Sequence, residues 1–265
     1  MPANTGPSEM IRSTIHCNSA PTATFPASVV FNMYMRIHLT AVATISAVAL
    51  LIPAVASATK IELGEMDASV TATCPTNCQA VSRVTGYQTL AGLLPPKDGK
   101  SGSPRKDLFV APGEGRIVSI TLKLGKPNKA QLAFFTERLG AASQVRVAII
   151  KPKYKRNNDD RNVLNAQSDL IELNQYFGKT VEIPLKTSLL VRKGYIVALT
   201  IPTWAPVLAA GTGYDNTFAW RASRGKPCAD TMTQAAQELA GSFTQYFCQY
   251  RTARLTYSAT MISPP

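Results

Sequence analysis

Alternating apolar and polar residues recur along the second half of the chain. Between residues 116 and 124, Val118, Ile120, Leu122 and Leu124 fall on one face of an extended chain, with polar side chains between them. This period of two is typical of a half-buried β-strand. The same alternation, or a short apolar run, predicts further strands at residues 144–150, 195–201, 251–259, 61–63, 80–84, 108–110, 132–135, 170–173, 180–183 and 218–221.

Clusters of Gly, Pro, Asn and Asp separate these segments, for example at residues 112–115 and 125–128. Only residues 231–239 show a helical pattern, and residues 86–106 have no period and are expected to form a surface loop. Many short strands with turns between them favour an antiparallel sandwich or barrel. The predicted fold class is therefore all-β, an antiparallel β-sandwich in a single domain over residues 59–265.

An apolar segment before this domain has the layout of a secretory signal peptide. Residues 35–58 begin with Met-Arg, continue with a mostly apolar helical core and end in Ala56-Ser57-Ala58, which predicts cleavage before Thr59. An uncleaved anchor helix is the alternative, but Pro53 and the short apolar core disfavour a stable span. Residues 1–34 are then a disordered extension or lie upstream of the true start. No transmembrane span is expected after cleavage.

Cysteine usage agrees with export. Cys17 precedes the signal, and Cys74, Cys78, Cys228 and Cys248 follow it. An even number of cysteines in an exported chain predicts two disulfides, and proximity in sequence favours Cys74–Cys78 with Cys228–Cys248 among three possible pairings. A four-thiolate metal site is the rival, which the wide spacing of the second pair disfavours. The prediction is a secreted or cell-envelope-associated protein with no metal and no cofactor.

The net charge of the chain is +12. Cleavage before Thr59 would remove only Glu9, Arg12 and Arg36 among the charged residues, so the mature domain remains strongly basic. Such a charge favours anionic partners, such as acidic polysaccharides or other cell-envelope polymers. Nucleotide binding and specific nucleic-acid binding are not predicted, because no phosphate-binding glycine motif follows a strand and export removes the usual target.

Both histidines, His16 and His38, lie before the predicted cleavage site. The mature domain would therefore lack Ser-His-Asp and Cys-His catalysis and every His-ligated zinc or copper site. No other catalytic motif is present, and no catalytic residue is predicted. The enzymatic alternative is a polysaccharide lyase that uses a Tyr or Lys base, and a structural or adhesive surface protein is a third hypothesis.

Two clusters are candidates for ligand binding. Residues 151–156 place four cations around one tyrosine, which suits a phosphate- or carboxylate-bearing polymer but also suits a charged loop that protects a sheet edge. The two tryptophans can stack on sugar rings beside anion-binding arginines, or they can simply fill the core. The candidate residues are Trp204, Trp220, Arg221, Arg224, Lys151, Lys153, Tyr154, Lys155 and Arg156.

One segment resembles a known kind of β-protein. Residues 180–200 combine a strand, a Pro-Leu step, a Val and a Lys-Gly pair before an alternating strand. This pattern resembles the late strands of jelly-roll carbohydrate-binding modules, over about residues 108–200. Residues 202–206 and 220–224 resemble uncharacterised secreted bacterial proteins. The resemblance implies only a jelly-roll fold, and with the charge it leads us to expect a non-catalytic secreted domain that binds an anionic or carbohydrate polymer.

Overall fold

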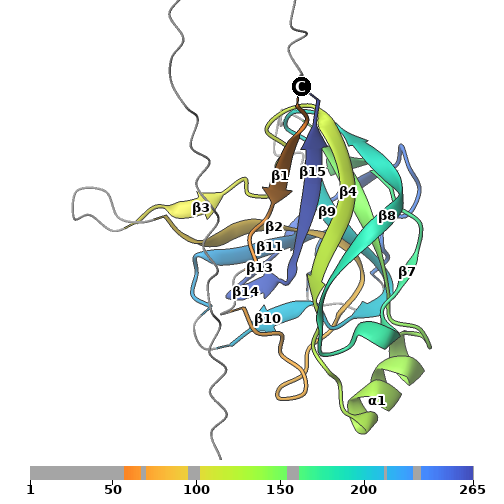
Figure 1. Ribbon diagram of the computed structural model, residues 1–265. Helices are drawn as coiled ribbons and strands as arrows, with labels where there is room; N and C mark the ends of the chain where they lie inside the picture. Colours follow the sequence, from red (N-terminus) through yellow and green to blue (C-terminus); the bar gives the residue numbers. More distant parts are fainter. Residues whose placement is uncertain are drawn as a thin grey trace, which may run out of the picture. The chain divides into compact units, whose positions relative to one another are not determined.

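The chain folds mostly into antiparallel β-sheets (Figure 1). The computed structural model describes residues 57–66, 70–94, 102–153, 161–211, 214–228 and 234–264. The predicted all-β class is confirmed over these ranges, where a single α-helix accompanies the strands. None of the helical structure described there is long and apolar enough to cross a membrane. The N-terminal extension and residues 35–56 of the predicted signal peptide lie outside the described residues.

The smaller of the two large sheets has four strands, which lie side by side in Figure 1. A register shift in its third strand, β4 (Gly115–Lys123), changes the alternation that the sequence predicts. Ile117 is fully buried, whereas Val118 is only half-buried. Ile120 and Leu122 face the core as predicted. In spatial order the strands are β1 (Thr59–Leu63), β15 (Tyr257–Ser263), β4 (Gly115–Lys123) and β8 (Thr180–Val191).

The larger sheet has nine strands, and its middle strands are buried on both faces. Val147, Ala148 and Ile149 have no exposed surface, and neither do Ala198 and Leu199 on the neighbouring strand. Most of its strands are hydrogen-bonded to their neighbours in the spatial order β12 (Phe243–Gln245), β6 (Arg161–Gln167), β5 (Gln144–Pro152), β9 (Ile196–Ala205), β2 (Val81–Leu93), β11 (Phe218–Ala222) and β13 (Cys248–Arg251). Two short strands pair at its sides, β3 (Pro104–Lys106) with β2 and β7 (Ile171–Glu172) with β5.

One apolar core joins the two large sheets. Buried side chains from both sheets belong to a single cluster, in which the Phe109 and Tyr257 rings lie 4.4 Å apart. The Tyr257 hydroxyl, on the smaller sheet, donates to the Val197 carbonyl on the larger one at 2.8 Å. A two-stranded sheet of β10 (Leu208–Ala210) and β14 (Ala253–Leu255) also contributes to this core.

Four sequence predictions of local structure are wrong. Residues 108–110, expected as a strand, form a turn in which Val110 makes only an isolated bridge to Ile196. The strand expected at residues 132–135 lies inside α1 (Lys129–Leu139), because Asn128 and Gln131 form a reciprocal capping box that starts a helix, and a short apolar run cannot distinguish the two structures. The described part of the expected helix, residues 234–239, is not helical. The expected loop over residues 86–106 instead contains most of β2 and all of β3.

Both predicted disulfides are present. Cys74 pairs with Cys78, and Cys228 pairs with Cys248 at the start of β13. The first closes a loop with a sequence separation of 4 residues and the second a loop with a separation of 20. The longer loop restricts the unfolded chain more, so the second bridge has the larger entropic effect.

We expect loss of the Cys228–Cys248 bridge to lower the free energy of unfolding by roughly 3 kcal/mol, and loss of Cys74–Cys78 by roughly 2 kcal/mol, from loop-closure entropy. The variants are the two double Cys→Ser substitutions. Urea denaturation followed by circular dichroism measures both values. A larger loss from the shorter loop would contradict this entropic ranking.

Candidate functional site

Strand β12 brings together the two clusters that the sequence singled out. It pairs with β6, where Thr244 lies opposite Asn162, and Asn162 in turn lies opposite Pro152 of β5. The end of β5 therefore reaches the strand, and Lys153 places its Nζ 5.3 Å from the centroid of the Phe243 ring. This distance is in the range of a cation–π contact.

The second cluster contacts the chain just after β12. The chain that follows β11 turns so that the Arg224 carbonyl accepts hydrogen bonds from the backbone N–H of Phe247 at 3.0 Å and of Cys248 at 3.4 Å. Lys226 then lies with its Nζ 4.5 Å from the centroid of the Phe247 ring. Two lysines from segments far apart in sequence thus lie over two aromatic rings that are four positions apart in the chain.

These side chains form one exposed face at the edge of the larger sheet. Alternation along the chain turns Phe243, Gln245 and Phe247 outward, and the two phenylalanines are 58% and 40% exposed. Exposed cations of β5 and β6 lie on the same face of the sheet. Lys151 and Phe243 both pair with Val163 and so share one row of side chains, while Arg161 pairs with Gln245. We call this face the β12 surface, made of Lys151, Lys153, Arg161, Lys226, Phe243 and Phe247.

A cationic depression adjoins the β12 surface, and we call it the Arg224 hollow. Its volume is about 370 Å³, and its lining includes Arg224, Lys226, Gln234 and Thr244. The Arg224 side chain is 5% exposed and donates to the Tyr250 hydroxyl. No acidic residue occurs among the described side chains of this lining. The described lining of this hollow is therefore basic, through Arg224 and Lys226.

The two tryptophans occupy different environments. Trp204 has no exposed surface, its ring lies 4.9 Å from that of Phe135 and 5.6 Å from that of Phe177, and its N–H donates to the Gly140 carbonyl at 3.1 Å. These contacts favour a packing role over ligand binding. Trp220 is 6% exposed and lines a hollow at the protein surface, so it remains a candidate.

The remaining predicted residues divide into two groups. Arg221 donates to the Tyr246 carbonyl at 2.8 Å, which helps to position the chain just before Phe247. Its role in this structure is therefore to hold the site in place. Tyr154, Lys155 and Arg156 lie outside the described residues.

The segment that carries β12 is anchored by the buried amide of Gln237. Its backbone N–H donates to the Thr85 hydroxyl at 3.0 Å, and its Nε2 donates to the Ser242 carbonyl at 2.7 Å. Its Oε1 accepts from the Tyr246 hydroxyl at 2.6 Å. Because a buried amide without such partners would be costly, this network specifies one position for the segment.

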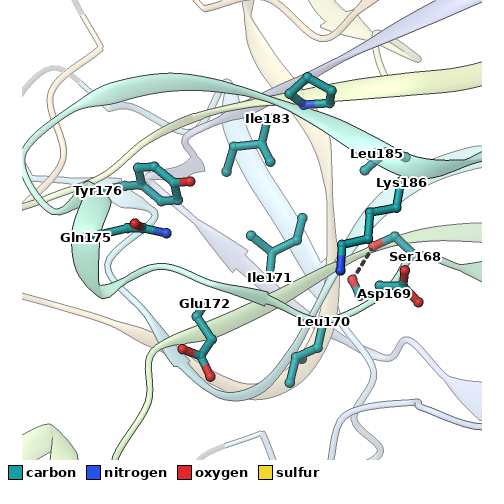
Figure 2. A pocket seen from close by; sticks show the side chains of 11 residues that line it. Ser168, Asp169, Leu170, Ile171, Glu172, Gln175, Tyr176, Ile183, Leu185 and Lys186 are labelled. Atoms are coloured by element: carbon teal, nitrogen blue, oxygen red, sulfur yellow. Dashed lines mark hydrogen bonds between the residues drawn. The ribbon is translucent and has the colours of Figure 1, made fainter.

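A further hollow, of about 190 Å³, lies between β7, the 3-10 turn η1 (Asn174–Tyr176) and β8, and Figure 2 shows its side chains. Ile171 and Ile183 lie at its centre, between Tyr176 and Lys186 in this view (Figure 2). The lining carries carboxylates as well as this lysine. It has no consistent charge and does not adjoin the basic clusters, so the candidate site is placed at β12.

The sequence did not reveal β12 or its exposed rings. Residues 243–248 place aromatic side chains on both faces of the chain: Phe243 and Phe247 point outward, while Tyr246 is fully buried. This arrangement hides the period of two on which strand prediction depends. The sequence does place Phe243 and Phe247 close to Cys248, whose disulfide with Cys228 anchors the loop that contains Arg224.

Comparisons with known proteins give no match to a protein family, a curated protein or a solved structure. Over the described ranges, no group of three or more His, Cys, Asp and Glu side chains is placed to hold a metal ion. The interpretation of the site therefore depends on its own geometry.

We expect Trp204→Ala to lower the free energy of unfolding by about 3 to 5 kcal/mol, the usual cost of removing a large buried aromatic ring. Thermal and urea unfolding measure this loss. A loss below about 1 kcal/mol would show that Trp204 is not the core residue that its contacts indicate.

The buried tyrosines predict a loss of stability at alkaline pH. Burial raises the pKa of both Tyr246 and Tyr257 above the ordinary value of 10.0, since the ionised phenolate is poorly solvated there. Above about pH 10 the unfolded state therefore binds fewer protons than the folded state, and the free energy of unfolding falls as pH rises. We expect Tyr246→Phe to give a shallower fall than the wild type in urea denaturation between pH 8 and pH 12. An unchanged slope would contradict this assignment.

Proposed function

We propose that residues 59–265 form an exported, non-catalytic domain that binds acidic polysaccharides or related anionic polymers of the cell envelope through the β12 surface. The observation that carries this proposal is the convergence of cations from separate segments around two exposed rings. Lys153 lies over Phe243 and Lys226 over Phe247, although 73 positions separate the two lysines in the chain. A shallow, extended basic surface suits a chain with repeating charges better than a small molecule.

The β12 surface has exposed aromatic rings in addition to its positive charges. A lysine contacts each phenylalanine, yet both rings keep accessible area. Apolar faces of this kind can pack on the C–H faces of sugar rings, while the lysines attract carboxylate or phosphate groups. The combination favours a polymer that carries both sugar rings and negative charges.

Two features support the proposal that the domain is exported. Strand β1 begins at Thr59, the first residue after the predicted cleavage site, so cleavage there would leave the sheet intact. The two disulfides are of a kind that persists in oxidising compartments outside the cytosol. We retain the jelly-roll sandwich as a proposal, supported by two large antiparallel sheets that share one core.

The decisive experiment compares two variants with the same change in net charge. The site variant is Lys153→Gln/Arg161→Gln/Lys226→Gln, and the control is Lys60→Gln/Lys179→Gln/Lys193→Gln, whose cations lie elsewhere. We expect the site variant to bind polygalacturonate at least tenfold more weakly at 150 mM salt, since each cation near an anionic surface contributes about 1 kcal/mol. Isothermal titration calorimetry measures both affinities.

The control variant should bind within about twofold of the wild type, because its lost charges act only through the screened long-range field. Equal losses in the two variants would show that the net charge attracts the polymer without a specific site. No binding of the wild type to polygalacturonate, teichoic acid or peptidoglycan at low salt would overturn the proposed function.

A further inference from the structure

A second hollow lies beside the Arg224 hollow, and we call it the Trp220 hollow. Its volume is about 280 Å³, near the lower end of the range of roughly 300 to 1,000 Å³ typical of ligand pockets. Trp220 and Tyr250 form one part of its lining, with their rings stacked 4.6 Å apart at an angle of 23°. The other lining residues are Gln79, Ala80, Val81, Ser82, Val84, Leu208 and Gln234.

The indole N–H of Trp220 is a buried donor without an acceptor among the described residues. The opposite edge of the ring packs against β2: a Cβ on Gly86 would lie 3.0 Å from Cζ3 and 3.1 Å from Cε3 of Trp220. The N–H edge is therefore turned away from Gly86. Because an unsatisfied buried donor is costly, an acceptor that enters the hollow beside this ring would be favoured.

The lining of the Trp220 hollow is neutral and amphipathic. Val84, Leu208 and the two aromatic rings provide apolar surface, whereas Ser82 and the amides of Gln79 and Gln234 provide polar groups. None of the described residues in its lining carries a formal charge at neutral pH. A ligand that fits this chemistry has an apolar face and hydroxyl or ether oxygens at its edge, which describes a sugar ring.

The neutral hollow and the cationic hollow are neighbours that share one described lining residue. Gln234 lines both, and its Nε2 donates to the Ser82 carbonyl at 2.5 Å within the Trp220 hollow. Arg224 of the cationic hollow donates to the hydroxyl of Tyr250, whose ring lines the neutral one. One ligand can therefore place an anionic group by Arg224 and an adjacent neutral ring by Trp220.

We propose that the Trp220 hollow is a sugar-ring subsite, in which a ring or hydroxyl oxygen accepts the Trp220 N–H while a carboxylate or phosphate of the same polymer lies in the Arg224 hollow. This inference rests on the proposed function and narrows it. The domain would select acidic glycans over anionic polymers that lack sugar rings.

A direct test uses the fact that the chain contains two tryptophans, so its 15N spectrum shows two indole N–H signals. Trp220→Phe removes one of them and thereby assigns it. We expect a galacturonate hexamer to shift the Trp220 signal and to leave that of Trp204 in place, while polyphosphate of equal charge shifts neither. An unmoved Trp220 signal at saturation with the hexamer would overturn the subsite.

Affinities of two variants complete the test. Trp220→Phe keeps an aromatic ring but loses the donor, and Ala80→Leu fills the hollow from the other side without removing any polar group. We expect each to weaken hexamer binding about three- to tenfold, the value of roughly one hydrogen bond, and to leave polyphosphate binding unchanged. The Ala80→Leu variant also decides the case if Trp220→Phe does not fold.

The outcomes separate the two proposals. If both ligands bind the wild type but neither variant discriminates between them, the sugar subsite is wrong and the β12 surface remains the binding site. If neither ligand binds the wild type at low salt, the proposed function fails and the subsite fails with it.

Discussion

The candidate site depends on one buried amide. Gln237 lies in a segment without regular secondary structure, and its side chain is bonded to the Ser242 carbonyl and the Tyr246 hydroxyl. Its backbone bonds to Thr85 tie the same segment to the middle of the larger sheet. An irregular segment has few backbone hydrogen bonds of its own, so these bonds provide most of its positional specificity. The positions of the exposed Phe243 and Phe247 rings therefore depend on a polar network in the interior.

The Cys228–Cys248 disulfide also restrains the chain around the candidate site. Cys228 and Cys248 connect the loop after β11 to β13, and the Arg224 carbonyl accepts two backbone hydrogen bonds from the same stretch of chain. The covalent bond limits how far the loop can move, and the hydrogen bonds fix its orientation. Together they hold Lys226 over Phe247 and the Arg224 side chain against Tyr250. The proposed binding surface, of which Lys226 and Phe247 lie outside the strands, thus has the fixed geometry that recognition would require.

The all-β class, most strand positions and both disulfides could be predicted, because alternation and cysteine spacing are local properties of the chain. The site could be predicted only in part. Lys153 and Arg224 were identified from short clusters of cations and aromatic residues, but their proximity to β12 depends on contacts between segments distant in sequence. The environments of Trp204 and Trp220 could not be distinguished either, since both are large rings in mostly apolar strands. The α1 capping box was visible in the sequence, yet the apolar run beside it suggested a strand.

The cations near β12 also oppose association of the exposed sheet edge with other chains. A short strand at the edge of a sheet with exposed phenylalanines offers a template for association with other chains. Lysines over those rings and an adjacent basic row oppose that association by charge repulsion between copies. This protective role and the proposed binding role are compatible but have different requirements. Protection needs charge of one sign, whereas recognition of an acidic glycan also needs accessible rings and the orphan N–H of Trp220, which contribute nothing to repulsion. The presence of both favours a binding surface over a merely protected edge.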